Sequence, residues 1–295
     1  MTDLRLPPRL TPHTTIQVGN TSFGRIDTDD ASPEVAQQQL VRIDFLGVPI
    51  DCCNMDTVVE LTTTAMRRRK RLQHGDINVA KFIDCRTDPE FRRYTAESDI
   101  ICPDGMGIVW GCQLMGFPVR ERVPGIDLMM RVIDVCALEG FRPYFFGAKQ
   151  EVLEKAIAEV RRRCPRLEIA GWRNGYFSPE DEAGIVAAIR ASRADCLFVG
   201  ISSPIKEKFL NRNRDAFNVP VQLGVGGSFD VLAREVPRAP AWMQRSGFEW
   251  LFRLSREPRR LAARYLKSNA QYAVILASAI GQRLFEKRVL PMRRR

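Results

Sequence analysis

The short sequence Cys102-Pro-Asp-Gly-Met-Gly places a single carboxylate, Asp104, between a proline and a glycine at the end of an apolar run. A carboxylate at the tip of a strand can act as a general base that takes the proton from a hydroxyl nucleophile. It can equally be an ordinary turn residue, because aspartate hydrogen-bonds its own backbone in such turns. Asp76 and Asn78 belong to a neighbouring strand end, where a second carboxylate could raise the pKa of Asp104 or bind sugar hydroxyls.

Four glycine-bearing turns follow predicted strands and precede predicted helices. They are PDGMG (103–107), FGAK (146–149), GISSPIKE (200–207) and GVGGSFD (224–230). Glycine lets the backbone approach a ligand closely, and the free N–H groups of a following helix suit an anion. Any one of them could be only a tight turn, but together they predict a nucleotide or phosphate pocket. The pattern GxxxxGK[ST] is absent and GVGGSFD lacks the GxGxxG spacing, which disfavours a P-loop enzyme and a dehydrogenase.

Metal ligands are scarce in the sequence. The chain has two histidines, His13 and His74, and its eight cysteines form no C-x-x-C pair. Asp27-Thr28-Asp29 has the D-x-D form that many sugar transferases use for a metal ion, but it lies in a polar segment without periodicity. We therefore expect an enzyme without a metal site and without a cofactor.

The elements that would position these residues alternate along the chain from Val41 onward. The β-like runs are 41–50, 76–84, 99–105, 142–147, 167–172, 196–201 and 221–227, and helices are expected at 56–71, 88–99, 107–116, 126–139, 150–163, 178–192, 203–217 and 228–233. This alternation predicts an α/β fold with a Rossmann-like, mostly parallel sheet flanked by helices. Residues 1–38 are predicted to be disordered, 39–241 to form the α/β domain, and 242–295 to form a helical, basic appendage.

The positive charge of the chain lies at its C-terminal end. Residues 245–295 carry 13 Lys and Arg against 3 Asp and Glu, which accounts for the whole net charge of +10. Such a segment favours a phosphate-rich partner, either nucleic acid or an anionic lipid surface. A nucleic-acid-binding protein is the alternative function. We do not expect nucleic acid as the partner, because the basic residues lack interleaved stacking aromatics and the rest of the chain is neutral.

Eight segments of the chain carry a resemblance to a known family. They read PDGMGIVWGCQLMG, RERVPGIDLMM, FGAK, NGYF, SPIKEKF, GVGGSFDVLA, RAPAWMQRSGFEWLFRL and EPRRLAARYL, and they fall between about Phe45 and Leu266. In these segments the chain resembles the TagA/WecG/CpsF family of bacterial glycosyltransferases (glycosyltransferase family 26). The resemblance implies transfer of a sugar from a UDP-sugar to a saccharide on undecaprenyl diphosphate, in surface or exopolysaccharide synthesis. It also implies an inverting, metal-independent enzyme attached peripherally to the cytoplasmic face of the inner membrane.

The resemblance assigns roles to individual residues. Asp104 corresponds to the aspartate of the DG[IM]G motif, the family's general base. Asp76 and Asn78 correspond to an acceptor-binding Thr-x-Asn motif, so Asp76 departs from the usual threonine. Lys206, in SPIKE, stands where the family commonly has glutamine, whereas Glu207 is retained. The residues assigned to the UDP-sugar donor are Gly105, Gly147, Lys149, Ser203, Lys206, Glu207, Gly226, Gly227 and Ser228.

Without a metal ion, the diphosphate of the leaving UDP needs other positive partners. The candidates are Arg253, Arg259, Arg260 and Arg264. Two of these, Arg259 and Arg260, are adjacent and cannot both face the same way on a helix. We therefore expect about two of the four arginines to reach the diphosphate, because neighbouring helical positions point in different directions.

The last segment has one apolar side with basic residues around it. The apolar residues are Leu266, Tyr272, Ala273, Leu276, Ile280 and Leu284, and the basic ones are Lys267, Arg283, Lys287, Arg288 and Arg293 to Arg295. A basic helix of this kind suits an anionic bilayer surface, and the alternative is a helix docked on its own core. The expected partners are thus a UDP-sugar donor, a lipid-linked saccharide acceptor and the anionic inner-membrane surface, with a homo-oligomer left open. No apolar stretch is long enough to predict a membrane span.

Overall fold

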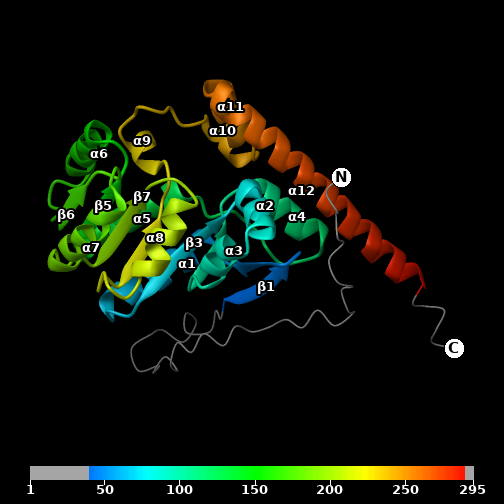
Figure 1. The fold of residues 1–295 in the computed structure, drawn as a ribbon, viewed down its shortest axis with the longest axis horizontal. Coiled ribbons are helices and arrows are strands. Elements are labelled where there is room, and N and C mark those ends of the chain that lie inside the picture. The colour runs from blue at the N-terminus through cyan, green and yellow to red at the C-terminus, as the bar shows by residue number, and fades with distance from the viewer. Residues whose placement is uncertain (1–39, 290–295) are drawn as a thin grey trace.

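The computed structural model describes residues 40–289. The segment predicted to be disordered, 1–38, lies outside the described residues together with Asp27 and Asp29, and so do residues 290–295. The centre of the fold is a six-stranded parallel sheet in the order β4-β3-β8-β7-β5-β6 (Figure 1). Its strands are β3 (Leu72–Ile77), β4 (Ile100–Pro103), β5 (Pro143–Gly147), β6 (Gly171–Arg173), β7 (Cys196–Gly200) and β8 (Val221–Gly224). The predicted α/β class with a parallel, helix-flanked sheet is confirmed.

Helices cover both faces of this sheet because its strands are apolar on both sides. On β7, Phe198 packs into the core shared with helices α1, α5, α6 and α9, whereas Leu197 and Val199 pack into the core shared with α7 and α8. The bounds of these helices are α1 (Met55–Arg67), α5 (Gly125–Glu139), α6 (Gln150–Arg163), α7 (Glu182–Ala191), α8 (Ile205–Asn213) and α9 (Ser228–Leu232). A single 3₁₀ turn, Pro179–Asp181, precedes α7. The carboxyl ends of the strands all meet at one edge, which is where ligands bind in such sheets.

A third core lies beside the β4 edge of the sheet. It joins an antiparallel hairpin, β1 (Val41–Phe45) and β2 (Val48–Cys52), to three helices that follow β3 and β4. These helices are α2 (Val79–Thr87), α3 (Pro89–Ala96) and α4 (Met106–Leu114). The hairpin is tied to the start of β4 by Asp51, which accepts a hydrogen bond from the backbone N–H of Ile101 at 2.7 Å and pairs with Arg42 at 2.8 Å.

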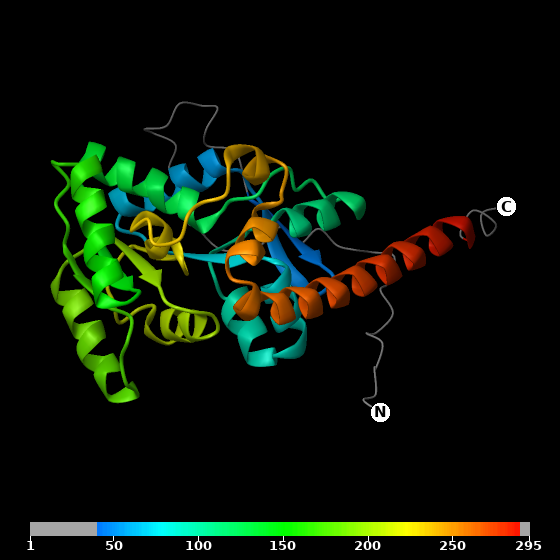
Figure 2. The same cartoon turned by 90° about the horizontal axis from the view of Figure 1, so that it is seen from above.

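The C-terminal part is helical, as predicted, and ends in one long helix. It comprises α10 (Ala241–Arg245), α11 (Glu249–Arg256) and α12 (Pro258–Val289). The middle of α12 packs beside α2, and its far end extends past the body (Figures 1 and 2). Tyr272 and Ala279 are buried in the third core, with Leu276 and Ile280 packed against it. For the part of the predicted apolar side that holds Tyr272, Leu276 and Ile280 the structure therefore bears out the docked alternative. The other residues of that side are exposed: Leu266, Ala273 and Leu284.

Three predicted β-like runs differ from the structure. The run 167–172 is strand only from Gly171, where β6 begins. Residues 41–50 form two strands rather than one, because Leu46 and Gly47 take positive φ angles of 54° and 88° and turn the chain back on itself. The run 76–84 is mostly helix, since β3 ends at Ile77 and α2 begins at Val79. Asn78 caps α2 by accepting a hydrogen bond from the backbone N–H of Lys81, and this cap is the physical reason for the change.

Candidate active site

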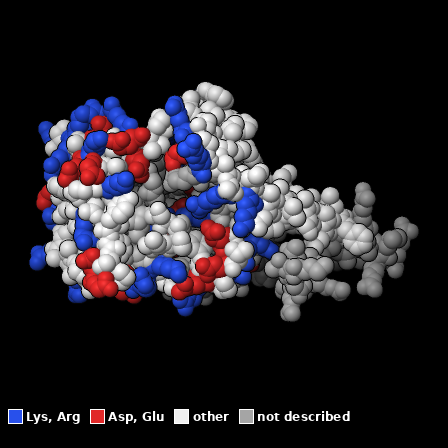
Figure 3. All heavy atoms as spheres, turned by 45° about the horizontal axis from the view of Figure 1, so that its top comes forward, with Lys and Arg blue, Asp and Glu red and all other residues white. Residues whose placement is uncertain are grey.

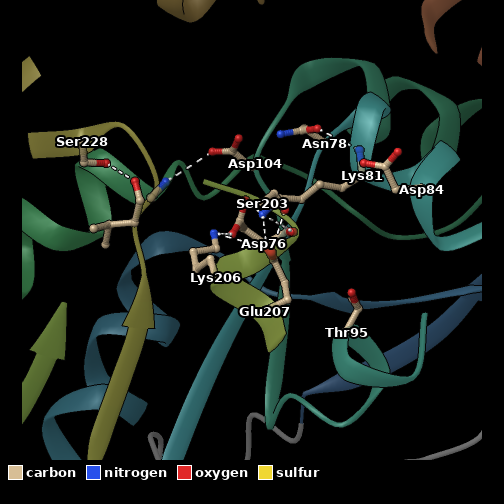
Figure 4. A network of polar contacts seen from close by, with 12 residues as sticks. Asp76, Asn78, Lys81, Asp84, Thr95, Asp104, Ser203, Lys206, Glu207 and Ser228 are labelled. Atoms are coloured by element: carbon tan, nitrogen blue, oxygen red, sulfur yellow. Dashed lines mark hydrogen bonds and ion pairs between the residues drawn. The ribbon is translucent and has the colours of Figure 1, made fainter. Parts of the chain in front are cut away.

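The candidate base Asp104 follows the last residue of β4, at the carboxyl edge of the sheet (Figure 4). Its backbone N–H donates to the carbonyl oxygen of Ile77, at the end of β3, at 2.8 Å. One of its carboxylate oxygens accepts a 3.3 Å hydrogen bond from the backbone N–H of Gly125, the first residue of α5. The side chain is half-buried, and these two bonds fix its position between the ends of β3 and β4.

The environment of Asp104 raises the pKa of its carboxyl. Burial is the largest cause and the negative charge of Asp76 adds to it, while Arg253, Lys81 and the Gly125 hydrogen bond oppose it. A carboxylate with a raised pKa is a stronger base than an ordinary aspartate. The surroundings of Asp104 therefore suit proton abstraction, which a plain turn residue would not need.

Asn78 lies across from Asp104, at the start of α2. Its side-chain oxygen caps the helix, at 3.1 Å from the backbone nitrogen of Lys81. Its amide nitrogen points toward the Asp104 side of the site (Figure 4). Because the cap fixes the oxygen, the side chain offers a hydrogen-bond donor to a ligand that reaches Asp104.

The other candidate acceptor residue, Asp76, is held in a buried network of ion pairs. Its two carboxylate oxygens lie 2.6 Å from the ammonium of Lys81 and 2.9 Å from the ammonium of Lys206. Glu207 lies 3.0 Å from Lys81 and 3.5 Å from Lys206, and it accepts a 2.6 Å hydrogen bond from the hydroxyl of Ser203. Asp76 and Lys206, the two positions at which the resemblance implied a departure from the family's usual residues, thus contact each other.

Burial and charge act in opposite directions within this network. Burial alone would raise the pKa of Asp76, but Lys206 and Lys81 outweigh it and hold that pKa well below its ordinary value. The pKa of Glu207 falls to about 2 for the same reason, since Lys81 and Lys206 outweigh its burial. Burial would lower the pKa of Lys81, but Asp76 and Glu207 raise it. All three groups are therefore charged at neutral pH.

A small cavity lies beside the network, between β3, α3 and α8. It has a volume of about 20 Å³ and is lined by His74, Ser98 and Thr95 as well as by Lys206 and Glu207. Burial lowers the pKa of His74 to about 4, so this imidazole is neutral at physiological pH. A space of this size can hold one water molecule but no sugar, so the substrates do not bind there.

The turn after β8 approaches Asp104 through Gly125. A Cβ on Gly125 would lie 3.7 Å from the Cα of Val225, so this turn and the start of α5 are in close contact. Gly226 has a φ of 52° and Gly227 precedes α9. The hydroxyl of Ser228 donates to the carbonyl oxygen of Val225 at 2.6 Å, and the backbone N–H groups of Val225 and Ser228 also have protein acceptors. The candidate donors of this turn are therefore the backbone N–H groups of Gly226 and Gly227.

The predicted donor residues near β5 lie further away. Gly147 has a φ of 146°, and a Cβ there would come within 2.4 Å of the backbone of Gly200, so only glycine fits. Lys149 is exposed just before α6. Strands β7 and β8 separate β5 from β3, which carries Asp76, so the structure does not bring Gly147 or Lys149 to Asp104. Gly105, by contrast, is the N-cap residue of α4 and follows Asp104 directly. A Cβ built on Gly105 would lie 3.6 Å from the Cβ of Asn78.

Of the four candidate arginines, Arg253 is the one whose charge acts on Asp104. It lies on α11 and pairs with Glu249 at 3.3 Å, with its side chain about half exposed. Arg264 lies 4.0 Å from Asp84, and Arg259 is exposed at the start of α12. The side chain of Arg260 lies outside what the structure describes.

Sequence reasoning missed two charged residues of this region. Lys81 is part of the ion-pair network. The one sign of its burial in the sequence is that this lysine lies within the apolar run VAKFI. Arg122 donates to Glu249 at 2.7 Å and to the carbonyl oxygen of Gln244 at 3.1 Å, and so ties α10 and α11 to the loop before α5. Arg122 lies in RERVPG, part of a segment that carries the family resemblance, but nothing in the sequence predicted its contact with Glu249.

Two further features of the described residues bear on function. Among residues 40–289 no group of three or more His, Cys, Asp and Glu side chains is placed to hold a metal ion. In the same part of the chain, no helix is both long and apolar enough to cross a membrane. The basic run Arg67 to Arg71 is largely neutralised, since Arg67 pairs with Glu139, Arg69 with Asp195 and Arg71 with Asp215.

The fold and the site define an α/β enzyme with its polar groups at the carboxyl edge of a parallel sheet. The chain belongs to the Glycosyl transferase WecG/TagA/CpsF family, whose profile matches residues 43–288. It is therefore a glycosyltransferase, as the motifs implied.

Two curated relatives carry the same name, N-acetylglucosaminyldiphosphoundecaprenol N-acetyl-beta-D-mannosaminyltransferase. The protein from Bacillus spizizenii is 34% identical over 203 residues, which cover 69% of this chain and 78% of the relative. The protein from Bacillus subtilis is 32% identical over 173 residues, which cover 59% of this chain and 67% of the relative.

Proposed function

We propose that this enzyme transfers a sugar from a UDP-sugar to the saccharide of a lipid-linked diphosphate, with Asp104 as general base. The observation that carries the proposal is the position of Asp104, a half-buried carboxylate with a raised pKa at the carboxyl edge of a glycosyltransferase fold. The names of the two relatives point to N-acetylmannosamine as donor sugar and to N-acetylglucosaminyl-diphosphoundecaprenol as acceptor. This donor and acceptor are therefore the first pair to test.

The chemistry is a single displacement. Asp104 takes the proton of the acceptor hydroxyl, the hydroxyl oxygen forms a bond to C1 of the donor sugar, and the bond from C1 to the diphosphate breaks, releasing UDP. Attack from the face opposite the leaving group inverts the configuration at C1. A general base of this kind contributes about 10² to 10⁴ in rate.

The leaving diphosphate needs positive partners, and we assign this role to protein groups rather than to a metal ion. Arg253 is favoured because it is close enough to Asp104 to lower its pKa. The backbone N–H groups of Gly226 and Gly227, in the turn that contacts Gly125, are suitable further donors. Arg259 and Arg264 lie near the start of α12, the helix that follows α11, and remain further candidates for the diphosphate.

Acceptor binding is assigned to Asn78 rather than to Asp76. The amide nitrogen of Asn78 points to the Asp104 side of the site (Figure 4), where it can donate to an acceptor hydroxyl or carbonyl. Both carboxylate oxygens of Asp76 already face lysines at 2.6 and 2.9 Å. An acceptor contact from Asp76 would have to break one of these ion pairs.

The membrane surface is assigned to a second apolar side of α12. Leu266, Val274, Leu284 and Phe285 are exposed, and at 3.6 residues per turn they fall within about 100° of one another, opposite Tyr272 and Ala279. Figure 3 shows uncharged atoms over much of the visible side of α11 and α12. Exposed apolar side chains beside basic residues suit the interface of an anionic bilayer, where a lipid-linked acceptor resides.

A donor screen tests the proposed function. Release of UDP is measured across UDP-sugars, including those of N-acetylmannosamine, its uronic acid, glucose and glucuronic acid. The acceptor is N-acetylglucosamine on a short lipid diphosphate, and the product linkage is read by mass spectrometry and NMR. We expect acceptor-dependent UDP release with one donor and an inverted anomeric centre. UDP release that does not depend on the acceptor, or a retained configuration, would contradict the proposal.

A further inference from the structure

The ion-pair network of Asp76, Lys81, Lys206 and Glu207 joins two turns that the sheet itself does not connect. Asp76 and Lys81 belong to the β3–α2 turn, whereas Lys206 and Glu207 lie in the first turn of α8, after β7. Strand β8 stands between β3 and β7, so no ladder hydrogen bond links the two strands. Two contacts cross from one turn to the other, Lys206 to Asp76 at 2.9 Å and Lys81 to Glu207 at 3.0 Å. Within the first turn, Lys81 lies 2.6 Å from Asp76.

Gly224 makes this connection sterically feasible. It is the last residue of β8, and a Cβ built on it would lie 2.9 Å from both Cδ and Cε of Lys206. The aliphatic part of the Lys206 side chain therefore passes over the end of β8 at a point where a Cβ would force it to shift. By this route the Lys206 ammonium reaches Asp76 on β3.

The network is buried and balanced in charge. Its four side chains are between 5% and 12% exposed, and two ammonium groups face two carboxylates. Lys81 donates hydrogen bonds to Oδ2 and to the carbonyl oxygen of Asp76, and its ammonium forms an ion pair with Oε1 of Glu207 at 3.0 Å. Loss of any one member of the network would leave a buried charge without compensation.

Residues assigned to the substrates are attached to both ends of the network. At one end, Glu207 accepts a 2.6 Å hydrogen bond from Ser203 in the β7–α8 turn. At the other end, the backbone nitrogen of Lys81 donates to Asn78 at 3.1 Å. Asp104 is bonded through its own backbone nitrogen to Ile77, between Asp76 and Asn78. The network thus fixes the donor-side turn relative to the acceptor-side turn and to the base.

We infer that Lys81, Lys206, Asp76 and Glu207 are positioning residues, which hold Ser203 and Asn78 in register with Asp104 and do not themselves contact the substrates. This inference rests on the proposed function for its kinetic consequence, but the mechanical link between the two turns is independent of it. It also gives Asp76 and Lys206 a joint role in place of two separate substrate contacts.

The network also faces Asp104 electrostatically. The charged groups that act on Asp104 are Asp76 from β3, Lys81 from α2 and Arg253 from α11, with the backbone N–H of Gly125 from α5. Replacing Lys81 by methionine leaves the negative charge of Asp76 less compensated. The pKa of Asp104 then rises, and the acid limb of the pH–rate profile moves to higher pH.

A double-mutant cycle tests the inference. The variants are Asp76→Asn, Lys206→Met and the two together, which leave Lys81 and Glu207 as a balanced pair. A shift of about 1 Å in reacting groups can lower the rate about 10²-fold, so we expect each single variant to lose kcat by about 10- to 10²-fold. The double variant should recover to within about tenfold of the wild-type rate, because neighbouring charges couple strongly. Gly224→Ala, which obstructs Lys206, should resemble Lys206→Met.

Lys208→Met is the matched control. Lys208 lies on the same helix and pairs with Glu90 at the surface, at 2.6 Å. We expect it to leave kcat and both KM values unchanged. Hydrogen exchange supplies a readout that needs no activity: Lys206→Met should speed exchange at residues 78–82, on the unmutated turn, whereas Lys208→Met should not.

The outcomes separate this inference from the proposed function. If no UDP-sugar is turned over by the wild type, the proposed function fails, while coupled exchange of the two turns would still support the mechanical link. If the fold losses in kcat of the two single variants multiplied in the double variant, the two residues would act independently and the inference would be wrong. It would also be wrong if the single variants raised the KM of a substrate without lowering kcat, because the residues would then be substrate contacts. Single variants that lower the melting temperature but leave kcat and the pH profile unchanged would overturn it as well.

Discussion

The phenol oxygen of Tyr272 lies 2.8 Å from the backbone carbonyl oxygen of Gly107 and donates a hydrogen bond to it. The ring also packs edge-on against Phe82, with 5.2 Å between the ring centroids. Gly111 makes room for this contact, because a Cβ there would lie 1.9 Å from the phenol oxygen. The middle of α12 is therefore anchored on the helix that begins two residues after Asp104.

We expect Tyr272→Phe and Tyr272→Ala to destabilise the protein to different extents. The phenylalanine variant keeps the ring contact and loses one hydrogen bond, for about 1 kcal/mol of unfolding free energy. The alanine variant also empties a buried site, for about 3–5 kcal/mol. Urea denaturation measures both, with Tyr176→Phe as the control because Tyr176 is exposed. Equal stability of all three variants would mean that α12 is not anchored through Tyr272.

Asp104→Asn should fold normally and lose nearly all transfer. The amide keeps the size of the side chain and its hydrogen bond from Gly125, but it cannot take a proton. The expected loss is about 10² to 10⁴ in kcat, the usual contribution of a general base. The melting temperature and the affinity for UDP serve as controls. A variant that retained more than about a tenth of the wild-type rate would assign Asp104 to the turn rather than to the chemistry.

The raised pKa of Asp104 predicts the sign of two pH effects. The rate should fall as the pH drops through this raised pKa, at a higher pH than an ordinary aspartate with a pKa of about 3.9 would give. Arg253→Met removes an opposing positive charge and should move this limb to still higher pH. Arg256→Met is the control, because Arg256 lies on the same helix but stacks on Phe252. If the acid limb of the pH–rate profile did not move in the Arg253→Met variant, Arg253 would not be close enough to Asp104 to affect its pKa.

The raised pKa of Asp104 also makes the stability of the folded protein depend on pH, with the protonated form being the more stable one. A carboxyl whose pKa is raised by folding favours the folded state when protonated, so stability is lost as the pH rises through the folded pKa. Asp104→Asn should therefore be more stable than the wild type at neutral pH, and the difference should vanish below about pH 3.9, the unfolded value. Thermal unfolding across this pH range measures the effect.

Chelation should leave the transfer rate unchanged, because we assign the leaving diphosphate to Arg253 and to backbone N–H groups. The measurement is UDP release with and without EDTA, after dialysis against chelator. If the rate fell and Mg²⁺ or Mn²⁺ restored it, the metal would belong to the mechanism. Asp27 and Asp29, which lie outside the described residues, would then be the first candidates for its ligands.

Membrane binding should depend on the exposed side of α12. We expect Leu284→Glu combined with Phe285→Glu to weaken co-sedimentation with anionic vesicles, while the rate with a water-soluble acceptor stays the same. Leu138→Glu is the control, because Leu138 is 85% exposed but lies near the end of α5, which packs beside α1 and α9. Binding should also weaken with salt. If co-sedimentation with vesicles did not depend on the α12 substitutions, on lipid charge or on salt, the proposed membrane-binding surface would be wrong.

The sequence predicted the parallel sheet because most of its strands are short apolar runs closed by turn residues. It misplaced β3, whose residues LQHGDI are mostly polar, so the apolar residues of α2 were assigned to a strand instead. The polarity of β3 has a physical reason in its surroundings, since His74 borders the small cavity and Asp76 meets two lysines. A single sequence contains no sign of those partners.

The same limit applies to the site. Asp104 could be placed at a strand end because Pro103 and Gly105 mark that end in the sequence. No such turn residues mark the end of β3, and Asn78 fell inside a run assigned to a strand. Lys81 could not be placed, since a lysine in the first turn of a helix is usually exposed. Its burial depends on Glu207, which only the packing of α8 beside α3 brings near. For the same reason the contact between Asp76 and Lys206 appears only in three dimensions.

The position of β8 has a consequence for how the chain is made. Leu72, at the start of β3, pairs with Val221 of β8, so one side of an early strand waits for a late one. During synthesis from the N-terminus, β3 and β4 leave the ribosome long before β8 exists. Until then β3 presents an uncovered row of backbone donors and acceptors, which can pair with another chain. Pairing between strands that are distant in the sequence slows folding and exposes the nascent chain to aggregation. We therefore expect the yield of folded protein to depend more on slower translation and on chaperone capacity than on the stability of the folded enzyme.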